Sequence, residues 1–218
     1  MQNLKYIIFD MDGVLFDTEL LMIQCYEKIA EEYNLPNVRN VCCKCIGVNA
    51  IRTQEIFKEH YGDQYPLDEI REKVVTLFRN TVAINGVPVK PYAEDLLCFL
   101  KKSNCYLALA SSTALDTVIR ELKQAGFYDY FDQVIGGDMV KESKPAPDIF
   151  LVACEKLGCD PKDTYVIEDS VNGLRAAYAA GTKPLAVPDL IELPSDVHSL
   201  CANVFQNLFE ALQFFKSL

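Results

Sequence analysis

The sequence predicts an α/β fold in which a mostly parallel sheet carries helices on both faces. From about residue 92 to the C-terminus, short apolar runs alternate with segments of helical periodicity, as in strand–helix–strand units. Polar clusters follow four of the chain's apolar runs, as functional side chains do at the carboxyl ends of parallel strands. Residues 18–88 show helical periodicity alone, which indicates an inserted helical domain.

The strands are expected where apolar runs are short and rich in strand-forming residues. The first is LKYIIF, and the later ones follow at intervals that leave room for a helix between neighbours. The expected strands cover residues 4–9, 105–110, 134–135, 164–168 and 184–187. The expected helices cover residues 93–102, 114–125, 147–157 and 171–180, together with the last dozen residues. Three of these helices stop at a glycine, a common C-cap residue. Together these elements predict a Rossmann-like core.

The segment between the first strand and residue 88 breaks this alternation. Leu21, Cys25 and Ile29 share one helical face, and the spacing of apolar residues stays helical as far as Phe78. We therefore expect a core domain of residues 1–17 and 89–218, with a small α-helical cap domain at 18–88. Glycine and proline near residues 86–91 suit a linker, and two linkers would let the cap open and close over a cleft.

Composition excludes several classes of partner. The chain has 218 residues and a net charge of −10, so its acidic surface should repel nucleic acid. No apolar run reaches the roughly 20 residues of a membrane span, and the N-terminus lacks the pattern of a signal peptide. The nine cysteines are scattered, and the cluster at residues 42–45 has no second ligand pair at zinc-site spacing. We expect a cytoplasmic monomer with reduced thiols and no membrane partner.

Four polar clusters should meet at one edge of the sheet. They combine carboxylates from two strands with hydroxyl groups and one lysine, a set of groups typical of an active site. The clusters are Asp10-Met11-Asp12-Gly13, Ser111-Ser112-Thr113, Lys144-Pro145 and Glu168-Asp169-Ser170.

These clusters, in this order, resemble the motifs of the haloacid dehalogenase superfamily. The matching segments are FDMDGVLFDTE at 9–19, the serine after LALA, SKPAPDIF at 143–150 and IEDSVNG at 167–173. In detail they are most similar to the β-phosphoglucomutase and sugar-phosphatase branch, which has a helical cap after the first motif. The resemblance covers nearly the whole chain and implies phosphoryl transfer through an aspartyl phosphate.

The resemblance assigns Asp10 as the nucleophile and Asp12 as the general acid/base. A carboxylate that attacks phosphorus forms an acyl phosphate, and a second carboxyl protonates the leaving oxygen and then activates water. Dehalogenases of this superfamily have no acid at the place of Asp12, because halide leaves without a proton. Asp12 therefore argues for phosphoryl transfer. Gly13 would allow the sharp turn after the nucleophile and approach the substrate.

The same resemblance implies a Mg²⁺ site made of oxygen ligands. Asp10, the backbone carbonyl of Asp12, and Asp169 would bind the ion, while Glu168 would reach it through water or orient Asp169. A divalent cation would offset the repulsion between these carboxylates and a phosphate dianion. The alternative interpretation is that Glu168 and Asp169 are ordinary acids at a helix N-terminus.

The remaining candidates would bind the phosphoryl group and the rest of the substrate. Ser111 would donate its hydroxyl to the phosphoryl oxygens, with Ser112 and Thr113 beside it, unless Ser111 is only an N-cap. Lys144 would neutralise the phosphoryl group and pair with Asp10. In the cap, the resemblance points to Gly47, Asn49 and Arg52 as the substrate-facing residues.

Phosphatases and mutases of this branch share the core chemistry and differ in the cap. The mutases carry a histidine, an arginine and a lysine that bind a second phosphate; Met22, Ala50 and Ala114 stand at those places. We therefore expect a phosphatase acting on a small phosphate ester, such as a sugar phosphate. A β-phosphoglucomutase-type enzyme and a non-catalytic phosphate-binding protein are the alternatives. A phosphonate hydrolase with Lys44 as Schiff base is disfavoured, because Asp12 would have no leaving alkoxide to protonate.

Overall fold

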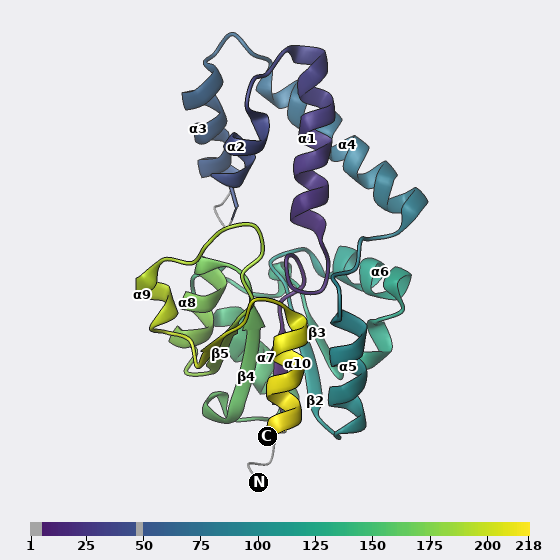
Figure 1. Cartoon of the computed structure of the whole chain (residues 1–218), viewed down its shortest axis with the longest axis vertical. Helices are drawn as coiled ribbons and strands as arrows, with labels where there is room; N and C mark the ends of the chain where they lie inside the picture. The colour runs from purple at the N-terminus through teal and green to yellow at the C-terminus, as the bar shows by residue number, and fades with distance from the viewer. Residues whose placement is uncertain (1–5, 47–49) are drawn as a thin grey trace. The chain divides into compact units, whose positions relative to one another are not determined.

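The computed structural model describes residues 6–46 and 50–218 of the chain, which divides into two compact units (Figure 1). One unit joins the residues up to Phe16 with Val89–Leu218, and the other is Asp17–Pro88. The boundary falls between Phe16 and Asp17, so Asp17 lies with the helical unit.

The first unit contains a six-stranded sheet in the order β3-β2-β1-β4-β5-β6. Every neighbouring pair is parallel, which confirms the predicted α/β class. β1 lies in the middle, with Phe9 in register with Leu109 of β2 and Ile167 of β4. The strands are β1 Tyr6–Phe9, β2 Tyr106–Ala110, β3 Gln133–Ile135, β4 Thr164–Glu168, β5 Lys183–Ala186 and β6 Asn203–Val204.

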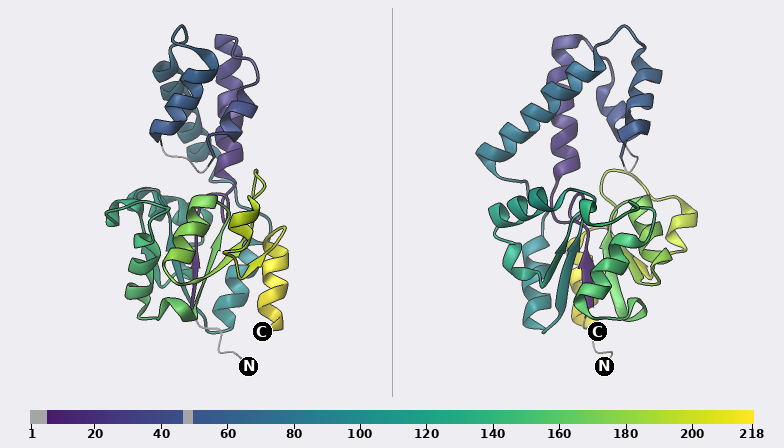
Figure 2. Two further views of the ribbon diagram at one scale, coloured as in Figure 1. Left: turned by 90° about the vertical axis from the view of Figure 1, so that its left-hand side faces the viewer. Right: turned by 180° about the vertical axis from the view of Figure 1, so that it is seen from behind.

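The helices of this unit lie on both faces of the sheet. α5 packs against α10 on one face, and α7 and α8 lie on the other (Figure 2). The α-helices are α5 Ala93–Lys102, α6 Leu115–Ala125, α7 Asp148–Leu157, α8 Val171–Ala179, α9 Ser195–His198 and α10 Leu208–Ser217. Short 3₁₀ turns are η1 Tyr128–Tyr130, η2 Gly137–Met139 and η3 Pro161–Asp163.

The core forms because the central strands are apolar on both faces. Ile7, Ile8 and Phe9 of β1 are fully buried, as expected for a parallel sheet covered by helices on each side. α5 contributes Leu96, Leu97 and Leu100 as one buried stripe. Each such side chain stabilises the fold by roughly 1.5–3 kcal/mol through burial. This core holds the carboxyl ends of β1, β2 and β4 in fixed positions.

The second unit is entirely helical, with α1 Thr18–Tyr33, α2 Val38–Cys43, α3 Ala50–Tyr61 and α4 Leu67–Asn85. α1 packs along α4, where Ile23, Ile29 and Val74 are buried. Tyr26 packs against Phe57 with ring centroids 5.0 Å apart. Burial next to Cys45 and Cys43 raises the pKa of Cys42 to about 12, so this thiol is unreactive at neutral pH. Across residues 6–46 and 50–218, every helix is too short or too polar to traverse a lipid bilayer.

Candidate active site

The chain turns sharply after β1 and presents two aspartates. The Asp10 N–H donates to the Ile167 carbonyl of β4 at 2.9 Å, which continues the β-ladder by one residue. The Phe16 N–H then donates to the Met11 carbonyl at 3.1 Å, and the Gly13 N–H donates back to the Phe16 carbonyl at 2.8 Å. Since Met11 and Phe16 are fully buried, they anchor the turn that carries Asp10 and Asp12.

Gly13 is required in this turn for two reasons. Its φ of +80° lies in the left-handed region, where a side chain is strained. A Cβ at this position would also lie 2.2 Å from Oδ2 of Asp169. The glycine therefore leaves the space that the Asp169 carboxylate occupies.

We expect Gly13→Ala to lower turnover by at least about 100-fold, because the Asp169 carboxylate must move away from its neighbours. Backbone strain should also lower the free energy of unfolding by about 1–3 kcal/mol. Gly158→Ala is the matched control, since Gly158 has a φ of +66° but a Cβ there would meet no atom within 4 Å. Turnover at several Mg²⁺ concentrations and urea unfolding measure both effects. Equal losses of activity in the two variants would refute the Asp169 explanation.

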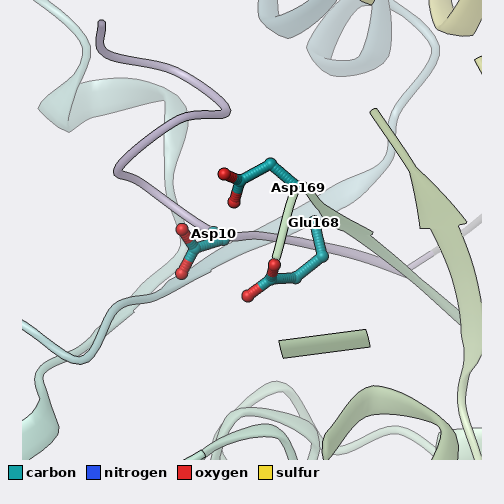
Figure 3. A group of neighbouring side chains, drawn as sticks. All are labelled: Asp10, Glu168 and Asp169. Carbon is teal, nitrogen blue, oxygen red and sulfur yellow. The ribbon is translucent and has the colours of Figure 1, made fainter. Parts of the chain in front are cut away.

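Three buried carboxylates come together where β1 and β4 end (Figure 3). Asp10, Glu168 and Asp169 each offer an oxygen, and these three oxygens lie within 4.8 Å of one another. β1 and β4 are neighbours in the sheet, and the chain order reverses direction between them, which is where parallel sheets build their sites. This buried group of acids could hold a metal ion.

Lys144 is the cation placed against these acids. Its Nζ lies 2.5 Å from Oδ1 of Asp10 and 2.7 Å from Oε1 of Glu168. The ammonium also lies 4.9 Å from the ring centroid of Phe150, a cation–π contact. The side chain is only 8% exposed. Lys144 thus enters from the segment before α7 and bridges carboxylates at the carboxyl ends of two different strands.

Burial and charge set the protonation of this group. Burial raises the pKa of Asp10 well above its usual value, the Lys144 ammonium opposes this, and the charges of Glu168 and Asp12 raise the pKa further. Burial alone would lower the pKa of Lys144, but Asp10 and Glu168 outweigh it and raise that pKa, so Lys144 stays charged at neutral pH. With all three acids ionised, one ammonium leaves an excess of negative charge. A divalent cation bound to oxygen ligands would offset that excess, so the residues fit a metal site.

Glu168 has both oxygens engaged by protein groups. Oε1 accepts from Lys144, while Oε2 accepts from the N–H of Ser170 at 2.8 Å and from its hydroxyl at 3.0 Å. A Cβ on Gly173 would lie 1.7 Å from Oε1, so this helical glycine makes room for the carboxylate. Glu168 is therefore fixed in place and orients Lys144.

α8 begins at the end of this acidic segment. Its N-cap is Ser170, whose hydroxyl accepts from the Gly173 N–H at 3.0 Å. The N-cap of α8 is therefore Ser170, and the Asp169 carboxylate lies in the acidic group with Asp10 and Glu168. The alternative in which Glu168 and Asp169 are only ordinary acids at a helix N-terminus does not account for this arrangement.

Two hydroxyl groups hold the Asp12 carboxylate. The Ser111 hydroxyl donates to Oδ2 of Asp12 at 3.4 Å, and the Thr113 hydroxyl donates to the same oxygen at 3.2 Å. Ser111 is not an N-cap, because α6 begins only at Leu115, whose N–H donates to Oδ1 of Asp138 at 2.9 Å. The alternative in which Ser111 is only the N-cap of that helix is therefore wrong. Its neighbour Ser112 is exposed.

A further acid, Glu121, was missed by the sequence reasoning. It is 5% exposed on α6, on the same face as the buried Val118 and Leu122. Burial and, to a smaller extent, the charge of Asp12 raise the pKa of Glu121 to about 7, against the opposing effect of Arg120. The available signal was its spacing, since residues 118, 121 and 122 fall on one apolar helical stripe.

We expect Glu121→Gln to change the pH dependence of stability. The pKa of Glu121 is higher in the folded protein than in the unfolded chain, so the folded state holds the Glu121 proton more tightly. This difference stabilises the fold fully below the unfolded pKa, and the stabilisation is lost as pH rises through about 7. At pH 8 the variant should be more stable than the wild type by up to about 2–3 kcal/mol, with no difference near pH 4.5. Urea unfolding at both pH values measures this. A gain of the same size in Glu155→Gln, an exposed position on α7, would contradict it.

The contacts of the described residues do not test the substrate-facing residues predicted in the cap. Gly47 and Asn49 lie outside the described residues. The guanidinium of Arg52 forms exposed ion pairs along α3, at 3.0 Å from Glu55 and 2.8 Å from Glu59. A substrate-binding role for these residues stays a prediction.

The sequence of residues 7–187 matches the family described as haloacid dehalogenase-like hydrolase. The chain belongs to this family. The predicted resemblance is thereby confirmed, and so is the expectation that the protein is an enzyme of the hydrolase class. In this haloacid dehalogenase-like hydrolase, Asp10, Glu168 and Asp169 all lie within the matched residues.

Individual relatives agree with this assignment. The chain is 33% identical over 178 residues to the phosphorylated carbohydrates phosphatase of Thermotoga maritima, covering 82% of each protein. It is 33% identical over 197 residues to a probable pseudouridine-5'-phosphatase of Drosophila melanogaster, covering 87% of this chain and 84% of the relative. A crystal structure from Thermotoga maritima, described as a candidate β-phosphoglucomutase, superposes with a TM-score of 0.81 at 29% identity over 98% of this chain and 99% of the other.

Proposed function

We propose that this hydrolase is a Mg²⁺-dependent phosphatase that cleaves a small sugar phosphate through an aspartyl phosphate on Asp10. The observation that carries the proposal is the contact of Lys144 with Asp10 and Glu168 inside a buried group of acids. The names of the relatives support the substrate class, since phosphorylated carbohydrates and pseudouridine 5'-phosphate share a phosphate monoester on a sugar.

The reaction needs two displacements at phosphorus. In the first, a carboxylate oxygen of Asp10 forms a bond to phosphorus and the bond to the sugar oxygen breaks, while Asp12 gives a proton to that oxygen. In the second, water attacks the phosphoryl group while Asp12 takes a proton from the water. The bond between phosphorus and the Asp10 oxygen breaks, which releases inorganic phosphate and restores the Asp10 carboxylate. Asp12 therefore returns to its starting protonation state after each turnover.

The other residues hold charge in place during both steps. Lys144 lowers the pKa of Asp10 against the effect of burial and holds this carboxylate in position, and its ammonium would neutralise charge on the incoming phosphoryl oxygens. Ser111 would donate its hydroxyl to one of those oxygens. Asp10, Asp169 and the backbone carbonyl of Asp12 would bind Mg²⁺, with Glu168 reaching it through water because both Glu168 oxygens already accept from protein groups. When bound, the ion supplies positive charge that offsets the phosphate dianion beside the acids.

A mutase is the second candidate, favoured by the structural likeness to the candidate β-phosphoglucomutase. Such an enzyme must bind both phosphate groups of a sugar bisphosphate. Met22 on α1 and Ala114 before α6 cannot bind a second phosphate, because neither side chain carries a donor or a charge. These residues favour transfer to water.

Phosphorus-31 NMR separates the two outcomes. The purified protein is incubated with Mg²⁺, a trace of hexose bisphosphate, and a panel of hexose 1- and 6-phosphates with pseudouridine 5'-phosphate. Growth of the inorganic phosphate signal at the expense of one ester supports the phosphatase and identifies the ester. Conversion of a 1-phosphate into a 6-phosphate without free phosphate would establish the mutase instead. Protein with Asp10→Asn, prepared in the same way, controls for contaminating phosphatases.

A further inference from the structure

The hydroxyl of Ser111 has one proton to donate, and in this structure that proton points to Asp12. The oxygen of Ser111 accepts from the Thr113 N–H at 3.1 Å and donates to Oδ2 of Asp12 at 3.4 Å. A serine hydroxyl supplies a single donor. If Ser111 donates to a phosphoryl oxygen during the reaction, it cannot at the same time donate to Asp12.

Thr113 contacts the same oxygen of Asp12 and faces no such conflict. Its hydroxyl donates to Oδ2 at 3.2 Å, a shorter contact than that of Ser111. This contact suits either protonation state of Asp12, because Oδ2 can accept while Oδ1 carries or releases the proton. The hydrogen bond from Thr113 can therefore persist through both proton transfers.

The backbone of Thr113 is held from two sides. Its N–H donates to Ser111, and its carbonyl accepts from the Gly137 N–H of η2 at 2.9 Å. The same 3₁₀ turn supplies Asp138, which accepts from the Leu115 N–H at the start of α6. A β-branched side chain on a backbone fixed in this way has few alternative rotamers. The hydroxyl of Thr113 is thus set toward Asp12 before any substrate binds.

We propose that Thr113 is a positioning residue that holds the Asp12 carboxyl for proton transfer once Ser111 has turned to the phosphoryl group. This inference rests on the proposed function, because it assumes that Asp12 protonates a leaving oxygen. A positioning role can be told apart from direct phosphate binding. Loss of positioning lowers the rate most when the leaving oxygen needs a proton, whereas loss of phosphate binding lowers the rate with every leaving group.

The test compares two leaving groups in three variants. Thr113→Val removes the hydroxyl at similar volume, and Thr113→Ser keeps it. Thr117→Val makes the same exchange within α6, at a position whose hydroxyl shows no contact with the acids among the described residues. The substrates are p-nitrophenyl phosphate, whose leaving group needs no proton, and the hexose phosphate that the wild type consumes fastest. The value of kcat/KM is chosen because it reports the steps up to formation of the aspartyl phosphate.

The proposal predicts a selective loss. Thr113→Val should lower kcat/KM for the hexose phosphate by about 10- to 100-fold and for the aryl phosphate by less than about 3-fold. Thr113→Ser and Thr117→Val should stay within about 3-fold of the wild type on both substrates. Equal losses on the two esters in Thr113→Val, or no loss on the hexose phosphate, would overturn the inference alone. Absence of turnover by the wild-type protein on either ester would instead overturn the proposed function, and the inference with it.

Discussion

Asp10→Asn should lower kcat by at least about four orders of magnitude while the protein stays folded. An amide oxygen is a poor nucleophile, so the aspartyl phosphate cannot form. The fold should persist because the amide oxygen can still accept from Lys144, and Lys144 keeps its second contact with Glu168 at 2.7 Å. Phosphate release under saturating substrate measures the loss, and circular dichroism with urea unfolding checks the fold.

The matched control for this variant is Asp196→Asn. Asp196 is 65% exposed in its ion pair with Arg175, so the same exchange there should leave kcat within about 2-fold of the wild type. A second measurement identifies the reacting atom directly. Quenching wild-type protein during turnover with hydroxylamine should convert the acyl phosphate to a hydroxamate at residue 10, visible by mass spectrometry. Near-normal turnover by Asp10→Asn, or a hydroxamate at another acid, would refute the nucleophile assignment.

Much of the fold could be read from the sequence because its signals were local. The residues of β4 and α5 were predicted to their ends, since apolar runs and amphipathic stripes are short-range patterns. β6 was missed because two exposed residues, Asn203 and Val204, carry no hydrophobic pattern; their pairing depends on β5 lying beside them.

The candidate site was predictable where groups follow strands and less so where they sit on helices or loops. Asp10, Glu168 and Asp169 lie at the carboxyl ends of β1 and β4, and parallel neighbours bring such residues together by geometry alone. Glu121 on α6, whose pKa is raised in part by the charge of Asp12, was not predictable in this way, because its burial depends on what covers its helix. The buried ion pair of Lys90 and Asp189 was missed for a related reason, since its members are 99 residues apart and neither belongs to a motif.

Lys144→Met should be the most destabilising of the proposed substitutions. It removes the ammonium that contacts both Asp10 and Glu168 while keeping the volume of the side chain. Breaking one side of a buried ion pair costs about 3–5 kcal/mol, because the remaining charges stay buried without that partner. We expect the free energy of unfolding to fall by about that amount at pH 8, and kcat to fall by at least about 1,000-fold. Urea unfolding and phosphate release measure the two effects.

The pH dependence of this loss separates electrostatics from packing. Lys144 lowers the pKa of Asp10 against the effect of burial, so its removal raises that pKa further. A carboxyl whose folded pKa is raised stabilises the protein below its unfolded pKa and loses that contribution as pH rises through the folded pKa. The deficit of Lys144→Met relative to the wild type should therefore be smaller at pH 5 than at pH 8. A deficit that is the same at both pH values would show that lost packing against Phe150, rather than lost charge, causes the effect.

Lys90→Met is the control that separates loss of stability from loss of activity in Lys144→Met. Lys90 and Asp189 also form a largely buried ion pair, with side chains 15% and 9% exposed, so this substitution too should lower the free energy of unfolding. The ammonium that pairs with Asp10 and Glu168 is that of Lys144, so the kcat of Lys90→Met should stay within about 3-fold of the wild type. If both lysine variants lost activity in proportion to stability, Lys144 would act only by holding the fold. If only Lys144→Met lost activity, its ammonium would be part of the phosphoryl-transfer site.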